Sequence, residues 1–157
     1  MSQLRGAVDL PTKQAVSQTP LRVRYAETDQ MGIVHHANYL VWFEMGRVEW
    51  LRQMGFDYKR METEDDCMIA VVEASCRYKA PARYDDELIV QTTLTALRGF
   101  LLKFHYRLLR AADEQLLAEG ETTHVVVGHD LKKRNLPEKY VSAFQNVCME
   151  PGKSHRV

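Results

Sequence analysis

The chain has 157 residues, of which 45% are hydrophobic and 27% charged, as is ordinary for one soluble globular domain. Lysine plus arginine and aspartate plus glutamate each number 21, so the formal net charge is zero and no overall field attracts nucleic acid or an anionic membrane. The sequence therefore predicts that any affinity for phosphate groups is local and that nucleic acid is not a partner.

The cysteines and the N-terminal residues show no sign of metal binding or export. Cys67, Cys76 and Cys148 are odd in number and widely spaced, with no CxxC pair and no zinc-ligand spacing, which favours free or buried thiols in a reducing compartment. The N-terminus lacks the apolar core of a signal peptide, and no apolar run approaches the length of a membrane span. We expect a cytoplasmic protein without stable membrane insertion.

In chain order, residues 1–19 are polar and without periodicity, which predicts a flexible N-terminal tail. We expect a single domain over residues 20–150 and a frayed C-terminus at 151–157. The domain opens with alternating apolar residues, typical of a first strand. These residues are Leu21, Val23 and Tyr25.

A polar loop then leads into a helix that is apolar over most of its circumference. At about 100° per residue, one apolar stripe comprises Tyr39, Phe43, Gly46, Trp50 and Met54. The opposite side carries Val41, Trp42, Met45 and Val48. Such a helix is expected to be surrounded, so we interpret it as the central helix. Asn38 is the expected N-cap and Gly55 the expected terminating residue.

The second half of the chain alternates with period two, which indicates strands. The four alternating segments cover about 68–79, 88–94, 100–108 and 116–127. Residues 57–66, before them, are charged and form either an irregular segment or a short helix. Pro137 suits the first turn of a terminal helix that runs to about Met149. These elements predict an α+β fold, with a five-stranded antiparallel sheet wrapped around one long helix.

The start of the central helix is where chemistry is expected. The first N–H groups of a helix have no internal partners, and the helix dipole attracts negative charge there. Asp29 lies nine residues before Asn38 and can fold back beside these donors. A carboxylate next to a pair of donors is what hydrolysis of an acyl group requires. The alternative is that Asp29 only caps its own loop in an Asx-turn.

The string ETDQMGIVHHANYLVWFEMGRVEWL carries a more specific signal. It resembles the signature of the 4-hydroxybenzoyl-CoA thioesterase family, and within it the short acyl-CoA thioesterases associated with the bacterial Tol-Pal system. His35 departs from the pattern, because an aromatic ring is commoner there. The resemblance implies a hotdog fold, hydrolysis of acyl-CoA without a cofactor, and a homodimer that shares its active site and often pairs into a homotetramer.

The resemblance places the catalytic carboxylate at Asp29, either as a nucleophile that forms a mixed anhydride or as a general base on water. His36 is the expected second catalytic residue, although a structural loop histidine is an equal alternative. A zinc site at Asp29, His35 and His36 is not expected, because adjacent histidines rarely face one ion. The expected oxyanion and substrate contacts are Gly32, Val34, His35, Ala37, Asn38 and Glu44.

Two basic clusters compete for the phosphates of coenzyme A, and the sequence does not rank them. They are Lys132, Lys133 and Arg134, and the group of Arg77, Lys79 and Arg83. Glu44 is expected either to pair with Arg47 or to reach the pocket as a second carboxylate. The alternative to an enzyme is a non-catalytic acyl-binding or scaffold protein on the same fold. A hotdog dehydratase is a third option, and the aspartate loop argues against it.

Overall fold

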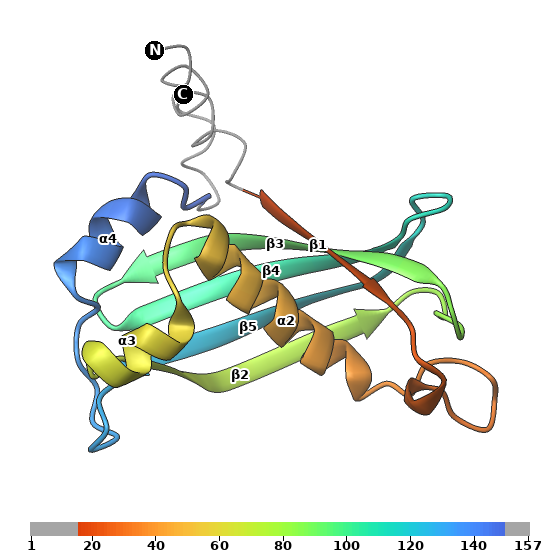
Figure 1. Cartoon of the computed structure of the whole chain (residues 1–157), viewed down its shortest axis with the longest axis horizontal. Helices are drawn as coiled ribbons and strands as arrows, with labels where there is room; N and C mark the ends of the chain where they lie inside the picture. The colour runs from red at the N-terminus through yellow and green to blue at the C-terminus, as the bar shows by residue number, and fades with distance from the viewer. Residues whose placement is uncertain (1–15, 150–157) are drawn as a thin grey trace, which may run out of the picture.

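The computed structural model describes residues 16–149, as one antiparallel sheet with a long helix lying across it (Figure 1). The strand order is β1-β3-β4-β5-β2. The strands are β1 (Val16–Arg22), β2 (Met68–Tyr78), β3 (Glu87–Arg98), β4 (Leu101–Arg110) and β5 (Leu116–Val127). The helices are η1 (Tyr25–Glu27), α2 (Asn38–Gln53), α3 (Tyr58–Glu64) and α4 (Glu138–Gln145). The predicted α+β architecture with five strands and a long helix is confirmed.

Helix α2 is held against the sheet by a stripe of aromatic rings and one glycine. Phe43 stacks on Tyr106 with ring centroids 4.4 Å apart, and Trp50 meets the edge of Phe104 at 5.3 Å. A Cβ atom on Gly46 would lie 2.5 Å from Oγ1 of Thr92, so only glycine lets the helix approach β3 this closely. The stripe predicted from helical periodicity therefore forms the centre of the core.

The other side of α2 is only partly covered, contrary to the prediction of a surrounded helix, since Trp42 is buried whereas Val41 and Met45 are not. Leu40, Val41 and Met45 are 42%, 52% and 41% exposed. The sheet of one chain curves around only one face of the helix, so periodicity identified apolar residues correctly but could not say what covers them. The apolar side chains that remain exposed form a strip on the surface of the single chain.

The first strand begins earlier than predicted. β1 starts at Val16, which pairs with Thr93, so residues 16–19 belong to the sheet and not to a tail. Its inward side chains include Ser17 and Thr19, whose polarity hid the alternation. Tyr25, expected in this strand, lies in η1 and is 77% exposed. The remainder of the predicted tail and the predicted frayed C-terminus lie outside the described residues.

The helix ends differ from the predictions in two places. Ala37, not Asn38, is the N-cap of α2. The Asn38 amide instead donates to the carbonyl oxygens of Glu27 and His35, at 2.9 and 3.3 Å. Gly55 adopts φ +91° just after the helix, which confirms it as the terminating residue. Residues 57–66, predicted to be either irregular or a short helix, contain the short helix α3. Helix α4 ends at Gln145, before the predicted end at about Met149.

β2 is an edge strand with both faces partly open. Its only partner in the sheet is β5, and a register shift occurs between Val71 and Glu73. Val71 and Val72 are 50% and 58% exposed. A long edge strand with unpaired backbone groups and exposed apolar side chains is a template for pairing with a further strand.

No helix within the described residues is long and apolar enough to cross a membrane.

Candidate active site

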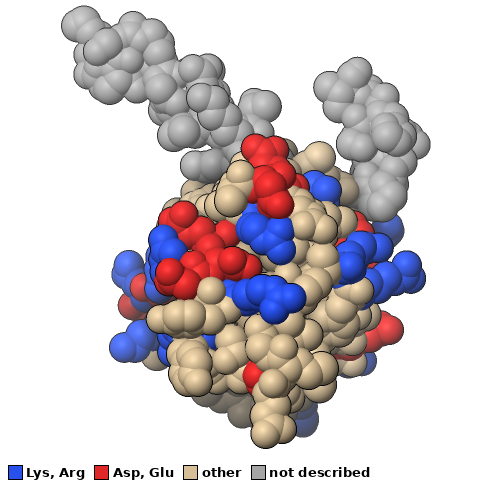
Figure 2. All heavy atoms as spheres, turned by 90° about the vertical axis from the view of Figure 1, so that its right-hand side faces the viewer, with Lys and Arg blue, Asp and Glu red and all other residues tan. Residues whose placement is uncertain are grey.

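A cavity of about 370 Å³ lies between the loop before α2 and the end of β2. Its wall combines the predicted carboxylate with aromatic, aliphatic and basic side chains. The lining residues are Asp29, Met31, Ile33, Val34, His36, Tyr39, Tyr78, Lys79, Ala80 and Pro81. Figure 2 shows this end of the molecule, where acidic and basic side chains intermingle above a largely uncharged area. The structure thus brings three of the predicted site residues, Asp29, Val34 and His36, to one cavity.

Asp29 stands in a tight loop that it helps to close. One of its carboxylate oxygens, Oδ1, accepts a hydrogen bond from the N–H of Met31 at 2.8 Å. The Asp29 N–H donates to the carbonyl of Ile33 at 2.8 Å. Gly32, whose φ of +82° suits glycine, donates its N–H back to the carbonyl of Asp29 at 2.9 Å. Asp29 therefore forms the Asx-turn that was the alternative reading, and it also lines the cavity.

Glu27 anchors this loop to the helix, and the sequence analysis did not single it out. Its buried carboxylate accepts from the Arg24 N–H at 2.8 Å, the Arg24 guanidinium at 3.1 Å and the Trp42 indole at 3.2 Å. Its carbonyl accepts from the His35 N–H at 2.8 Å and from the Asn38 amide. Burial raises the pKa of Glu27, but the hydrogen bonds from Arg24 and Trp42 hold it below the ordinary value.

Most backbone N–H groups of the loop are used within the chain. Val34 donates to the carbonyl of Ala82 at 2.9 Å, and Asn38 donates to that of His35 at 3.1 Å. Ala37 donates to Nδ1 of His35 at 3.2 Å. Across residues 34–38, all of them described, only the His36 N–H makes no hydrogen bond. Among the predicted site residues, the His36 backbone N–H is therefore the one that is free to donate to a bound oxyanion.

Tyr78, at the end of β2, fixes the position of His36. Its hydroxyl donates to the carbonyl of His36 at 3.0 Å, and its ring meets that of Tyr39 edge-on at 4.9 Å. Burial, together with Cys76 and Tyr39, raises the pKa of Tyr78 to about 12, so the hydroxyl stays protonated and can donate. The His35 and His36 rings stack with centroids 4.4 Å apart. The alternation of residues predicts Tyr78 only as part of a strand, and no sequence signal marks this contact.

The predicted coenzyme A residues fall in separate places. Lys79 lines the Asp29 cavity. Arg77 lines another cavity with His105 and Glu119, whose side chains bond each other at 3.0 Å. Arg83 lies in the turn before β3 and donates its N–H to Asp86. These three residues therefore do not line one common cavity.

The second basic cluster lies in the loop after β5, at the end of the molecule opposite the Asp29 loop (Figure 1). Arg134 is engaged there by Asp66, 3.3 Å away, and by the Asp66 carbonyl at 2.7 Å. Lys133 lies over the ring of Phe100 at 5.0 Å. Within one chain, the cluster of Lys132, Lys133 and Arg134 cannot contact a ligand held at Asp29.

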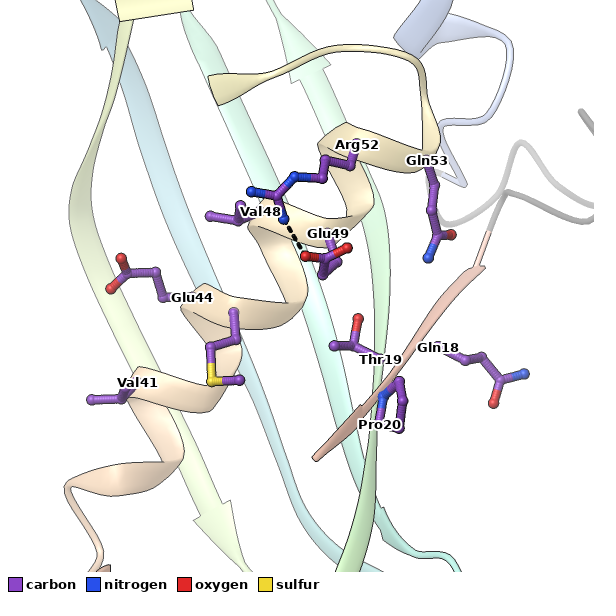
Figure 3. A pocket seen from close by; sticks show the side chains of 10 residues that line it. Gln18, Thr19, Pro20, Val41, Glu44, Val48, Glu49, Arg52 and Gln53 are labelled. Carbon is purple, nitrogen blue, oxygen red and sulfur yellow. Dashed lines mark hydrogen bonds and ion pairs between the residues drawn. The ribbon is translucent and has the colours of Figure 1, made fainter. Parts of the chain in front are cut away.

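Glu44 is exposed on α2 and makes no ion pair with Arg47 among the described residues, so the predicted helix pair is absent. Glu44 instead borders a larger groove of about 540 Å³ between α2 and β1 (Figure 3). The groove has Val41 and Met45 on one wall, and Glu49 pairs with Arg52 at its rim. Asp29 does not line this groove. Within residues 16–149, no three histidine, cysteine or acidic side chains are placed to hold a metal ion.

An antiparallel sheet wrapped around one long helix, with a carboxylate-bearing loop at the start of that helix, defines a hotdog-fold protein. The sequence matches the family model of the thioesterase-like superfamily over residues 23–144. The chain belongs to this superfamily, and the predicted family resemblance is confirmed.

Named relatives and solved structures agree with this assignment. The chain is 38% identical to the acyl-CoA thioester hydrolase YbgC of Escherichia coli, over 80% of this chain and 93% of the relative. It is 36% identical to the acyl-CoA thioesterase YbgC of Haemophilus influenzae, over 82% and 93% of the two chains. A crystal structure of a hypothetical protein from Thermus thermophilus superposes with a TM-score of 0.79 at 39% identity, covering 83% of this chain and 98% of the other.

Proposed function

We propose that the chain hydrolyses acyl-CoA to a carboxylic acid and free coenzyme A at the Asp29 cavity. The observation that carries the proposal is one cavity bounded by a half-buried carboxylate and by His36, whose N–H is unpartnered. Relatives at 36–38% identity named as acyl-CoA thioesterases or thioester hydrolases support the same reaction. No cofactor is required, because both a carboxylate and an oxyanion donor come from the chain itself.

Asp29 has two chemically complete roles. As a nucleophile, its free oxygen attacks the thioester carbonyl, coenzyme A leaves as the thiolate and takes up a proton, and water then hydrolyses the mixed anhydride. As a general base, Asp29 takes a proton from the water that attacks the same carbonyl, coenzyme A leaves as the thiolate, and the proton passes to it. In both, the carbonyl oxygen becomes negative and the His36 N–H donates to it. The bond from Met31 occupies only Oδ1, which leaves Oδ2 for either role.

The edge strand β2 supports a homodimer. Pairing of β2 with the same strand of a second copy is self-complementary when it is antiparallel, because each contact is then repeated by the two-fold axis. The second copy would cover the exposed Val71 and Val72. The apolar strip on the outside of α2 would remain for two dimers to form a homotetramer. Light scattering at micromolar concentration tests this, and a monomeric mass contradicts it.

The same pairing reconciles the two basic clusters. In an antiparallel pair, the beginning of one β2 lies beside the end of the other. Asp66 precedes β2 and is bonded to Arg134 and to the His129 N–H, so the loop that carries Lys132 and Lys133 travels with the beginning of the strand. Each copy would then place this loop near the Lys79 of its partner. Coenzyme A phosphates are expected to bind between them.

The experiment that tests the function is a panel of short, long and aromatic acyl-CoAs, followed by release of free thiol. We expect saturable turnover of at least one class. The competing proposal is an acyl-binding or scaffold protein without catalysis, which predicts binding of acyl-CoA by calorimetry with no release of thiol above the uncatalysed rate. The absence of both binding and turnover across the panel would reject both proposals.

A further inference from the structure

Arg47 is a half-buried cation on the flank of α2 with no acidic partner. Its Nη1 donates to the hydroxyl of Tyr106 at 3.1 Å. Within residues 16–149, no carboxylate lies at ion-pair distance from its guanidinium, including Glu44 one turn earlier in the helix and Glu62 on the neighbouring α3. A guanidinium has five N–H donors, so most of its hydrogen-bonding capacity remains free. Charges that are partly removed from water normally have a partner.

The groups behind Arg47 do not supply the missing negative charge. The Tyr106 hydroxyl bonds Oγ1 of Thr122 at 2.6 Å, and Thr122 bonds Nε2 of His124 at 2.8 Å. Burial raises the pKa of Tyr106. Burial, followed by the nearby charge of Arg47, lowers the pKa of His124 to about 3. At neutral pH the whole chain of hydrogen bonds is uncharged, so the positive charge of Arg47 is not compensated from the core.

Arg47 lies along the same helix as the proposed reaction site, at a distance that suits an acyl chain. Tyr39 lines the Asp29 cavity, and Arg47 follows it by eight residues, or about 12 Å at 1.5 Å per residue. Around Arg47 lies a small cavity of about 30 Å³. The other residues that line it are Glu44, Val48, Leu51, Tyr58 and Ile69.

Tyr58 adds a second donor at this cavity. Its hydroxyl accepts a hydrogen bond from the Ile69 N–H at 3.0 Å, so its own proton is available to a ligand. Burial raises the pKa of Tyr58, which keeps that proton on the oxygen at neutral pH. The cavity therefore offers a cation and a neutral donor beside the Glu44 carboxylate and the apolar side chains of Val48, Leu51 and Ile69.

We propose that Arg47 binds a carboxylate at the far end of the acyl group, so that the preferred substrates are medium-chain acyl-CoAs with a terminal carboxylate. This inference rests on the proposed thioesterase function and specifies its substrate class. A terminal carboxylate gives Arg47 a charge-assisted bond that a methyl end cannot make. A plain alkyl chain of equal length would leave the cation unpaired in the loaded site, so it is discriminated against.

The test compares suberyl-CoA with octanoyl-CoA, which have acyl chains of equal length and differ in the terminal carboxylate. We expect wild-type kcat/KM to favour suberyl-CoA by about tenfold or more, the scale of one charged hydrogen bond. Arg47→Met should remove or reverse this preference. Arg52→Met is the matched control, because Arg52 lies on the groove toward β1 and pairs with Glu49, and it should leave the ratio unchanged.

A wild-type ratio near one, or an equal loss with both substrates in Arg47→Met, would overturn the inference. A binding measurement separates this failure from failure of the proposed function. In an Asp29→Asn background, calorimetry should show suberyl-CoA binding about tenfold tighter than octanoyl-CoA, and Arg47→Met should abolish the difference. That result supports the Arg47 contact even if wild-type protein hydrolyses neither compound, whereas equal affinities overturn the contact whatever the turnover.

Discussion

Two carboxylates only two residues apart have opposite surroundings. Glu27 is 6% exposed and accepts hydrogen bonds from the Arg24 backbone, the Arg24 guanidinium and the Trp42 indole. Asp29 is half-buried, lines a cavity, and accepts one hydrogen bond from Met31 in the described structure. The Glu27 carboxylate, with three hydrogen bonds, fastens the loop to α2. The Asp29 carboxylate, with one, keeps an oxygen free for a substrate or water.

The comparison teaches that bonding, and not residue type or position in a motif, separates the two roles. A carboxylate that accepts three hydrogen bonds, with both oxygens engaged, is held ionised and fixed in place. It is a poor nucleophile or base, because reaction would require those bonds to break. The short spacing between the two residues lets one position the other.

The largest expected effect is on catalysis by Asp29→Asn. The change removes the charge but retains an acceptor for the Met31 N–H, so the melting temperature should change little. Turnover should fall about a hundredfold or more, the scale of losing general-base help. Asp113→Asn is the matched control, because Asp113 accepts from the Gln115 N–H in a similar turn, and it should leave turnover intact.

His36→Ala tests whether catalysis needs the His36 side chain or only the backbone N–H of residue 36. The oxyanion donor proposed here is the backbone N–H of residue 36, which alanine retains. A loss much smaller than that of Asp29→Asn is therefore expected. Near-wild-type kcat in Asp29→Asn would remove Asp29 from the mechanism.

Glu27→Gln should lower the stability of the fold, whereas Asp29→Asn should lower turnover and leave stability almost unchanged. A glutamine nitrogen cannot accept from Arg24 or Trp42, so at least one buried donor loses its partner, at a cost of about 1–3 kcal/mol. Urea unfolding at pH 7 measures this change in the free energy of unfolding. Glu64→Gln, on an exposed residue paired with Arg60, is the control and should have little effect. Equal stability of Glu27→Gln and wild type would show that Glu27 does not anchor the loop.

His124 is a buried base whose lowered pKa makes the stability of the fold depend on pH. Burial lowers its pKa to about 3 from an ordinary value of 6.5, so below pH 6.5 the unfolded chain gains a proton that the native chain does not bind. This part of the stability is complete above pH 6.5 and is lost as the pH falls toward 3, with a slope of at most about 1.4 kcal/mol per pH unit. Unfolding of His124→Gln from pH 7 to pH 4 should show a shallower slope.

The smallest expected effect is on coenzyme A binding. Replacing Lys132 and Lys133 by alanine, with Arg134 kept because it holds Asp66, should raise KM several-fold and leave kcat unchanged, since such contacts serve ground and transition states alike. The effect should shrink at high salt. Lys59→Ala with Lys103→Ala removes the same charge elsewhere and should not change KM. An unchanged KM in the first pair would leave Lys79 and Arg83 as the phosphate contacts.

Most of the elements, and the loop that carries Asp29, could be predicted from the amino-acid sequence alone. Period-two alternation identified four of the five strands, and helical periodicity identified the buried stripe of α2, because burial on one face imposes a repeat that local residues record. The loop with Asp29 was recognisable because the chemistry of the family requires particular residues at close spacing. The first strand was predicted several residues too late, because the inward positions of β1 include Ser17 and Thr19, which carry no apolar signal.

Only the tertiary structure decided which groups meet. Glu27, Trp42 and Tyr78 join the site through contacts that span 15 to 42 residues of sequence, and periodicity carries no information at that range. The basic residues 132–134 were placed at the opposite end of the chain's fold, although composition alone made them candidates for the pocket. The Asn38 side chain does not cap the helix, because its amide donates to the Glu27 carbonyl, which lies within reach in space. Each outcome depends on which side chains face one another after the sheet closes over the helix, and this is a property of packing rather than of local sequence.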